Sequence, residues 1–143
     1  MNHNLEVSKS IIVNADAAKV WDALTNPEII KEYLFGTETI TDWKVGSDII
    51  FQGEYQGQKY KDKGIVRENI LNKRLSYNYW SAFFGVEDKP ENYMLVTYVV
   101  TPKGDNQTEL TWIQKGFANE EGFQHAEKGM DSFLQGMKAI IER

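Results

Sequence analysis

Apolar and polar positions alternate with two different periods along the chain, and the helical period is clearest at its end. In the segment Gly122–Arg143, apolar side chains recur at spacings of three and four residues, which is typical of one face of an α-helix. These side chains are Phe123, Ala126, Met130, Phe133, Met137 and Ile140. The pattern predicts a long terminal helix whose apolar stripe faces a core.

Three glycines in the same segment lie on one side of the predicted helix, because Gly122, Gly129 and Gly136 follow one another at intervals of seven residues. A glycine inside a helix costs about 1 kcal/mol relative to alanine. One explanation is that this side faces solvent, where a missing side chain is tolerated. The other is that it lets the sheet, a loop or a ligand approach closely, or lets the helix shift over a pocket.

The start of the chain predicts one strand followed by two short helices. The segment "LEVSKSIIV" is typical of a strand, and we expect Asn14 to cap the first helix after it. In "TNPE", Asn26 can cap a second helix with Pro27 in its first position. This second helix is expected to end near Gly36.

From about Thr37 to Phe117 the period changes to two, which predicts strands. "DIIFQGEYQGQKYKDKGIVREN" gives two strands that turn near Gln56-Gly57, and a short strand is expected around Glu38–Thr41. Three more strands follow in "NKRLSYNYWS", "NYMLVTYVVTP" and "TELTWIQKGF", the last two joined by a tight turn at Lys103–Asn106. Grouped strands with helices at the ends predict an α+β fold. Without a linker or repeat, residues 1–143 are expected to form one domain.

The cations of one strand indicate which face of the sheet is buried. Lys59, Lys61, Lys63 and Arg67 occupy alternate positions and therefore share one face, which we expect in water. The residues between them then face the core: Tyr60, Asp62, Gly64 and Val66.

Turn positions extend this interpretation to the neighbouring strands. They place Val66 opposite Tyr77, Gly64 opposite Tyr79, Val96 opposite Gln114 and Tyr98 opposite Trp112. The predicted inner face is thus rich in large rings. These rings either fill a core beneath the helix or, with a few polar groups and flexible methionines, line a ligand cavity.

The candidates for a ligand-binding cavity are Asp62, Val66, Tyr77, Tyr79, Tyr98, Trp112, Gln114, Met130, Phe133 and Met137. The loop "SAFFGVEDKPEN" is longer than a hairpin needs, so it is a candidate for function. Phe83 and Phe84 within it either close the mouth of the cavity or anchor the loop to the edge of the core.

Composition narrows the classes of function. The chain has no cysteine, two histidines and a net charge of −5, and we expect no nucleic-acid or membrane partner, no metal and no cofactor. Without a signal peptide or a membrane-spanning run, a cytoplasmic location is expected, as a monomer or weak dimer. An acid–base enzyme would have to rely on Asp62 and His125, because His3 lies in the terminal segment. No catalytic residue set is predicted.

Three blocks of the sequence resemble a known family: "VNADAAKVWDALTNPEIIKEYLF", "TDWKVGSDIIFQGEYQGQKYKDKGIV" and "YMLVTYVVTPKGDNQTELTWIQKGF". They are similar to the C-terminal type of domain in the activator of heat-shock protein 90 ATPase, within the START-like (SRPBCC) superfamily, over roughly Val7 to Ile141. The resemblance implies a helix-grip fold, in which a curved antiparallel sheet surrounds the long C-terminal helix, often with a pocket between them. The chain departs from the family at Asp16, in "ILNKRL", and at Met130, where relatives often carry tryptophan.

Three functions follow as hypotheses. The superfamily implies binding of an apolar or aromatic small molecule or lipid, and the family implies a chaperone-regulating interaction domain. A length of 143 residues leaves room for the C-terminal type of domain only. Some superfamily members are cyclases or hydrolases, so an enzyme is the third hypothesis.

Overall fold

The computed structural model describes residues 1–143, and its strands form one antiparallel sheet of seven in the order β1-β7-β6-β5-β4-β3-β2. The strands span Asn2–Val13 (β1), Glu38–Ile40 (β2), Asp48–Tyr55 (β3), Gln58–Ile70 (β4), Arg74–Tyr79 (β5), Met94–Gly104 (β6) and Gln107–Phe117 (β7). The helices span Ala17–Thr25 (α1), Pro27–Tyr33 (α2) and Glu120–Glu142 (α3). Two short 3-10 turns, Ala82–Phe84 (η1) and Pro90–Asn92 (η2), separate β5 from β6. The predicted α+β fold, with two short helices after the first strand, is confirmed.

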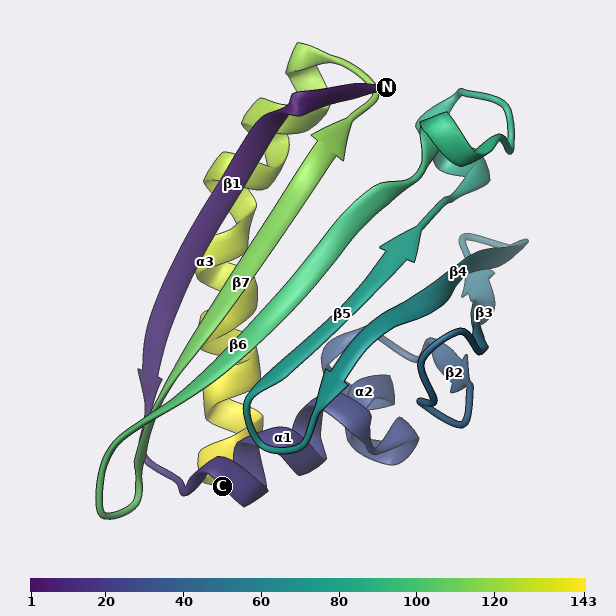
Figure 1. The fold of residues 1–143 in the computed structure, drawn as a ribbon. Coiled ribbons are helices and arrows are strands. Elements are labelled where there is room, and N and C mark those ends of the chain that lie inside the picture. The colour runs from purple at the N-terminus through teal and green to yellow at the C-terminus, as the bar shows by residue number, and fades with distance from the viewer.

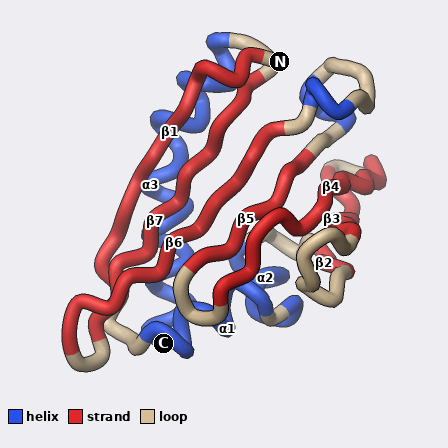
Figure 2. Tube along the Cα trace, in the orientation of Figure 1, coloured by secondary structure: helices blue, strands red, loops and turns tan.

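The helices lie on one face of the sheet (Figure 1). α3 runs along β1, β7 and β6, and α1 and α2 lie near its C-terminal end, so the strands form one layer and the helices the other (Figure 2). The N-terminus and the loop with η1 lie at the end of the molecule where α3 begins, and the C-terminus lies at the opposite end (Figure 1). None of the helices combines enough length and apolar character to cross a membrane.

The start of α1 corrects one prediction, because Asp16 and not Asn14 caps this helix. The Asp16 carboxylate accepts a hydrogen bond from the backbone amide of Lys19 at 2.8 Å. The chain stays non-helical through Ala15, whose carbonyl accepts a hydrogen bond from the Thr108 hydroxyl at 2.8 Å. The helix therefore begins too late for Asn14 to reach its first amides.

The start of α2 is as predicted. The Asn26 side chain accepts a hydrogen bond from the Glu28 amide at 3.0 Å, and Pro27 occupies the first helical position. Proline is suited to this place because the amide that it lacks has no partner within the helix.

The predicted register and sidedness of the sheet are confirmed. Three cross-strand pairs are as the sequence predicts: Val66 with Tyr77, Val96 with Gln114, and Tyr98 with Trp112. The bridge between Lys63 and Trp80 and the pair of Val66 and Tyr77 bracket the predicted pairing of Gly64 with Tyr79. The β4 cations are exposed on the other face: Lys59, Lys61, Lys63 and Arg67.

The main core lies between the sheet, α1 and the second half of α3. Its branched and unbranched aliphatic side chains are almost fully buried, among them Val13, Val20, Leu110, Leu134 and Met137. A smaller cluster of Val7, Phe117 and Met130 lies beneath the first half of α3. Burial of such side chains stabilises the fold by roughly 1.5–3 kcal/mol each.

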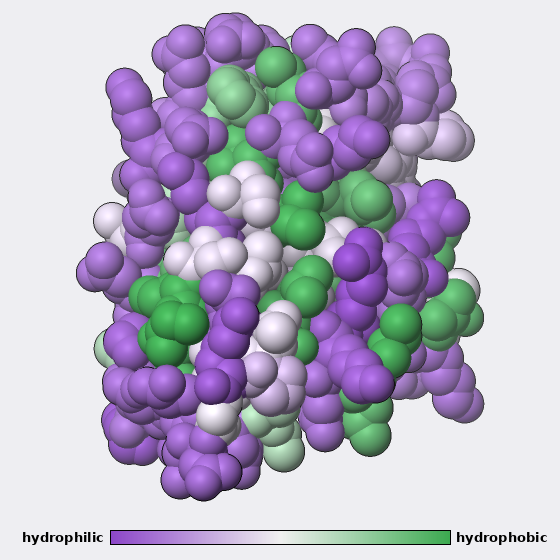
Figure 3. Space-filling model, turned by 60° about the vertical axis from the view of Figure 1, so that its left-hand side comes forward, coloured by the Kyte–Doolittle hydropathy of each residue, from purple (hydrophilic) through white to green (hydrophobic).

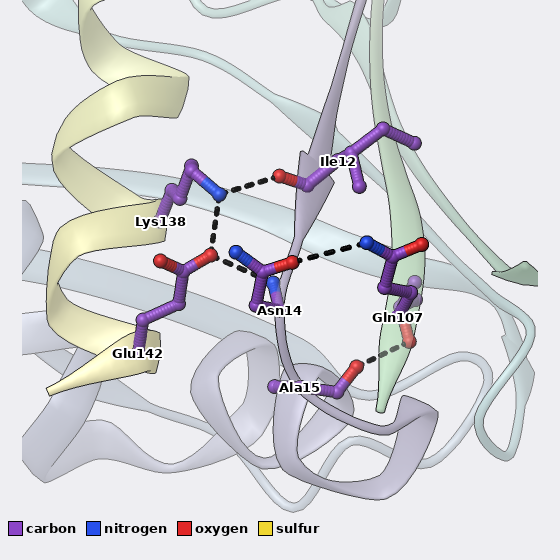
Figure 4. A network of polar contacts seen from close by, with 7 residues as sticks. Ile12, Asn14, Ala15, Gln107, Lys138 and Glu142 are labelled. Carbon is purple, nitrogen blue, oxygen red and sulfur yellow. Dashed lines mark hydrogen bonds and ion pairs between the residues drawn. The ribbon is translucent and has the colours of Figure 1, made fainter. Parts of the chain in front are cut away.

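A polar network fastens the C-terminal end of α3 to the segment that joins β1 to α1 (Figure 4). The Lys138 ammonium donates to the Ile12 carbonyl at 2.8 Å and pairs with Glu142. Glu142 in turn accepts a hydrogen bond from the Asn14 amide at 2.7 Å, and the Asn14 side chain accepts one from Gln107 at 3.3 Å. These contacts give partners to backbone groups that the sheet and helices leave free at this end.

The three helix glycines face solvent. An added Cβ would meet nothing within 4 Å at Gly129 or Gly136, and only the Asn119 side-chain oxygen at 3.4 Å at Gly122. Close approach of the sheet or of a loop, which the sequence left open as an explanation, is therefore wrong. On the face shown in Figure 3, hydrophilic residues predominate and hydrophobic ones form small separate patches.

Candidate functional site

A cavity of about 250 Å³ lies between the inner face of the sheet, the end of α2 and α3. Its wall is built mainly from aromatic side chains, with a single ionisable carboxyl group, that of Asp62. The lining residues are Leu34, Thr37, Phe51, Tyr60, Asp62, Tyr77, Tyr79, Met94, Val96, Tyr98, Trp112, Gln114 and Phe133. Most of them come from β3 to β7, because alternate positions of neighbouring strands point to the same face.

Cross-strand pairing sets the order of side chains around the cavity. Tyr77 lies opposite Val96, and Val96 lies opposite Gln114, so three strands contribute one continuous row. On the same face but nearer the β2 edge of the sheet, Phe51 of β3 lies opposite Asp62 of β4. Such directly opposed residues have Cβ atoms roughly 4.5–5.5 Å apart, which makes the wall contiguous.

The rings pack against one another rather than filling the cavity. Trp112 stacks on Tyr98 with centroids 6.1 Å apart and meets Phe133 of α3 at 4.8 Å. On the other side, Phe51 lies 5.7 Å from Tyr77 and 5.6 Å from Tyr79. Flat rings held edge to face and offset leave gaps that branched aliphatic side chains would fill.

Hydroxyl groups supply most of the polar contacts in the wall. The Tyr79 hydroxyl donates a hydrogen bond to the carboxylate of Asp62, which is 6% exposed. The hydroxyls of Thr37 and Tyr60 are hydrogen-bonded to each other. By contrast, the indole N–H of Trp112 is buried without a protein partner. An unpaired buried donor of this kind costs about 1–3 kcal/mol of stability.

Three tyrosines of the wall are protonated phenols and not phenolates. Burial raises the pKa of Tyr77, with a smaller opposing effect from the Tyr98 hydroxyl, and burial likewise raises the pKa of Tyr98. The pKa of Tyr79 is raised first by burial and then by the neighbouring Asp62 carboxylate. All three hydroxyls therefore keep their protons at neutral pH.

Two glycines make room for this arrangement. At Gly64 an added Cβ would lie 1.8 Å from the backbone oxygen of Asn78, so only glycine allows β4 to lie this close to β5. At Gly53 it would lie 2.6 Å from the Tyr60 hydroxyl, which needs that space to reach Thr37. Both positions support side chains of the wall without contacting the cavity themselves.

The structure brings together seven of the ten candidates that the sequence suggested: Asp62, Tyr77, Tyr79, Tyr98, Trp112, Gln114 and Phe133. The other three lie in packed regions. Val66 belongs to a cluster with Ile49 and Phe51, Met130 lies against Val7 and Phe117, and Met137 lies in the main core. Met130 therefore does not widen the cavity, although relatives often carry a larger side chain at this position.

The two phenylalanines of the long loop lie outside the cavity. Phe83 and Phe84 line a separate groove of about 440 Å³ near the start of α3, which also involves Met94 and Gln114 of the cavity wall. Phe83 is 60% exposed, with its ring 6.2 Å from Tyr60, whereas Phe84 packs on Tyr79 with centroids 5.8 Å apart.

His125 lines the groove near α3 and not the cavity that holds Asp62. The two residues therefore belong to different sites, and the acid–base pair considered from the sequence does not form in this structure.

Other cavity residues were not among the candidates, namely Leu34, Thr37, Phe51, Tyr60, Met94 and Val96. The alternation along β4 and the pairing of Val96 with Gln114 already place Tyr60 and Val96 on the inner face. The same alternation along β3 identifies Phe51. No local pattern identifies Thr37, because its position depends on how the chain leaves α2.

A long helix held against a curved antiparallel sheet, with a cavity between them, defines the helix-grip fold of START-like proteins. Within this class, the chain belongs to the family described as Activator of Hsp90 ATPase homolog 1-like proteins, whose sequence profile matches residues 14–142. No curated protein matches the chain.

Solved structures agree with this assignment. A protein from Cytophaga hutchinsonii is 38% identical over 99% of this chain and 97% of its own, with a TM-score of 0.84. The Aha1 dimer from Colwellia psychrerythraea is 18% identical, with 96% of each chain covered and a TM-score of 0.73. An HSP90 activator from Plasmodium falciparum is 15% identical, again with 96% of each chain covered and a TM-score of 0.73. At these identities the last two share the fold alone.

Proposed function

We propose that this protein binds a compact aromatic or apolar small molecule in the cavity beneath α3. The observation that carries the proposal is the lining of that cavity, which combines many rings with a few polar groups. Ligand sites typically combine an apolar wall with a few polar anchors. A wall of this kind gives affinity through its area and orientation through its anchors.

The size of the cavity limits the ligand. A volume of about 250 Å³ is somewhat below the roughly 300–1,000 Å³ of common ligand sites. We therefore expect a molecule of one or two fused rings rather than a long-chain lipid. For so small a ligand, a Kd on the order of 1–100 μM is expected.

Two valines provide a matched test, because both flank Tyr77 in the sheet. Val96 pairs with Tyr77 from β6 and lines the cavity, whereas Val66 pairs with it from β4 and is fully buried in a packed cluster. Isothermal titration calorimetry with the two-ring probe 1-naphthalenemethanol measures binding, and urea unfolding measures stability.

The substitution Val96→Phe should fill the cavity, weaken probe binding by about tenfold or more and leave stability nearly unchanged. The same change at Val66 should instead overpack the core and cost about 1–3 kcal/mol of stability. The proposal is wrong if the parent protein does not bind the probe, or if Val96→Phe binds it as well as the parent does.

A second function is supported by the family match and by the activator relative from Plasmodium falciparum, namely regulation of a heat-shock protein 90 ATPase. The test is ATP turnover by the chaperone from the same organism with this protein added at equal concentration. A several-fold stimulation supports this function, and unchanged turnover together with no co-sedimentation argues against it.

A further inference from the structure

The only ionisable carboxyl group in the cavity wall lacks a cationic partner. Asp62 is 6% exposed, and none of the ion pairs in the structure includes it. Its one hydrogen-bond partner is the Tyr79 hydroxyl, which contacts a single carboxylate oxygen. Buried carboxylates are normally paired with a cation, because removing an ionised group from water is costly.

Aromatic rings make up much of the cavity wall to which this carboxylate belongs. Seven of the lining residues are aromatic: Phe51, Tyr60, Tyr77, Tyr79, Tyr98, Trp112 and Phe133. The faces of such rings carry negative partial charge and attract a cation placed over them. Because the phenols keep their protons, the rings act through their faces and hydroxyls and add no negative charge of their own.

The opposite face of β4 does not supply the missing cation. Lys61 and Lys63 flank Asp62 in sequence, but their side chains are exposed on the outer face of the sheet. Lys63 is paired there with Asp88. Water and salt weaken the influence of such exposed charges on a group inside the cavity.

The charge of the wall distinguishes between classes of ligand. An anion would meet the Asp62 carboxylate at close range, and a neutral apolar molecule would bury that carboxylate further without compensating it. A protonated amine would satisfy the free carboxylate oxygen and contact the ring faces at the same time.

We propose that the cavity binds a compact organic cation, an aromatic or apolar amine whose ammonium group contacts Asp62 while its body lies among the rings. This inference rests on the proposed ligand-binding function and specifies the chemical class of the ligand.

Three probes of nearly equal shape test it by isothermal titration calorimetry at neutral pH. They are 1-naphthylmethylamine, which is a cation, 1-naphthalenemethanol, which is neutral, and 1-naphthoic acid, which is an anion. We expect the amine to bind at least about tenfold more tightly than the alcohol, and the acid to bind most weakly.

The variant Asp62→Asn removes the charge while keeping the size of the side chain and an acceptor for the Tyr79 hydroxyl. It should weaken binding of the amine by about tenfold and leave binding of the alcohol within about twofold. The matched control is Glu54→Gln on β3, which makes the same change in net charge at an exposed position opposite Lys59. This control should leave the ranking of the three probes unchanged.

The outcomes separate the two proposals. If no probe binds, both the ligand-binding function and the cation inference are wrong. If the three probes bind with similar affinity, or the acid binds best, the cavity binds ligands but the cation inference fails. The ranking by the parent protein decides this question even if Asp62→Asn does not fold.

Discussion

The interface between α3 and the sheet has two sides, one packed with aliphatic side chains and one that contains a cavity lined by rings. Where the C-terminal half of α3 meets β1 and α1, aliphatic side chains interdigitate, and the surrounding polar groups are paired in the network of Figure 4. Under β3 to β7, flat rings face one another across a cavity of about 250 Å³, and the Trp112 N–H has no partner. We call these the closed side and the cavity side.

The difference between the two sides lies in side-chain shape and in polar pairing. Val13, Leu110 and Leu134 fill space in three dimensions and leave the closed side fully packed. Rings such as Tyr98 and Trp112 stack in layers and leave room beside them. Stability should therefore depend most on the closed side, and binding on the cavity side, except where the cavity wall depends on a close backbone contact.

The largest effect is expected at such a contact on the cavity side. In Gly64→Ala the new Cβ would overlap the backbone oxygen of Asn78, which cannot move without separating β4 from β5. We expect a loss of about 3 kcal/mol, the upper part of the range for overpacking. Urea unfolding measures the loss, and probe binding should fall with it because Asp62 and Tyr79 lie on these two strands. A variant as stable as the parent would show that the strands are not held together at this point.

Two buried threonines, one on the closed side and one on the edge strand β2, differ in the pairing of their hydroxyls. Thr108, on the closed side, donates its hydroxyl to the Ala15 carbonyl, whereas the buried hydroxyl of Thr39 on β2 has no partner. Valine has nearly the same shape without the hydroxyl. Thr108→Val should lower stability by about 1–3 kcal/mol because it leaves a buried carbonyl unpaired. Thr39→Val should raise stability by up to about 1 kcal/mol. Thermal and urea unfolding of both variants test the opposite signs, and a loss in both would mean that Thr39 also has a partner.

The sequence predicts the architecture better than it predicts the cavity. Strand alternation is a strong signal, because a shift of the register by one residue would bury Lys61 and Lys63. The inner face could therefore be assigned correctly from the sequence. The same rule cannot tell which inner-face residues border empty space. Val66 and Val96 both face inward beside Tyr77, yet only Val96 lines the cavity. Whether an inward side chain is covered depends on the side chains that pack over it, and strand alternation does not specify these.

Local signals also fail where several residues satisfy the same rule. In "NADA", both Asn14 and Asp16 are suitable helix caps, and the choice depends on the non-local bond between Ala15 and Thr108. The glycine spacing in α3 likewise identifies one side of the helix but not its surroundings. Only the three-dimensional structure shows that this side faces solvent.

The exposed glycines give a smaller effect, of opposite sign to that at Gly64. Gly129→Ala and Gly136→Ala place a methyl group where nothing lies within 4 Å, so each should stabilise the protein by up to about 1 kcal/mol through helix propensity. The sites are two helical turns apart, so the effects should add in the double variant. Urea unfolding measures the gain. Probe affinity should stay unchanged, because neither glycine lines the cavity; a loss of affinity would show that flexibility of α3 contributes to binding.

The smallest expected effect concerns the pH dependence of the closed side. The hydrogen bond from the Asn14 amide, followed by the contact with Lys138, lowers the pKa of Glu142 from its ordinary value of 4.5. A carboxyl group with a lowered pKa in the folded state stabilises the protein fully above its unfolded-state pKa. That contribution is lost as the pH falls through the folded-state value. Stability should therefore fall slightly less steeply below about pH 4.5 in Glu142→Gln than in the parent. Urea midpoints between neutral and acidic pH test this, with exposed Glu91→Gln as the control for a change in net charge. Identical acid profiles for the parent and Glu142→Gln would mean that the network in Figure 4 holds this carboxylate no more tightly than water does.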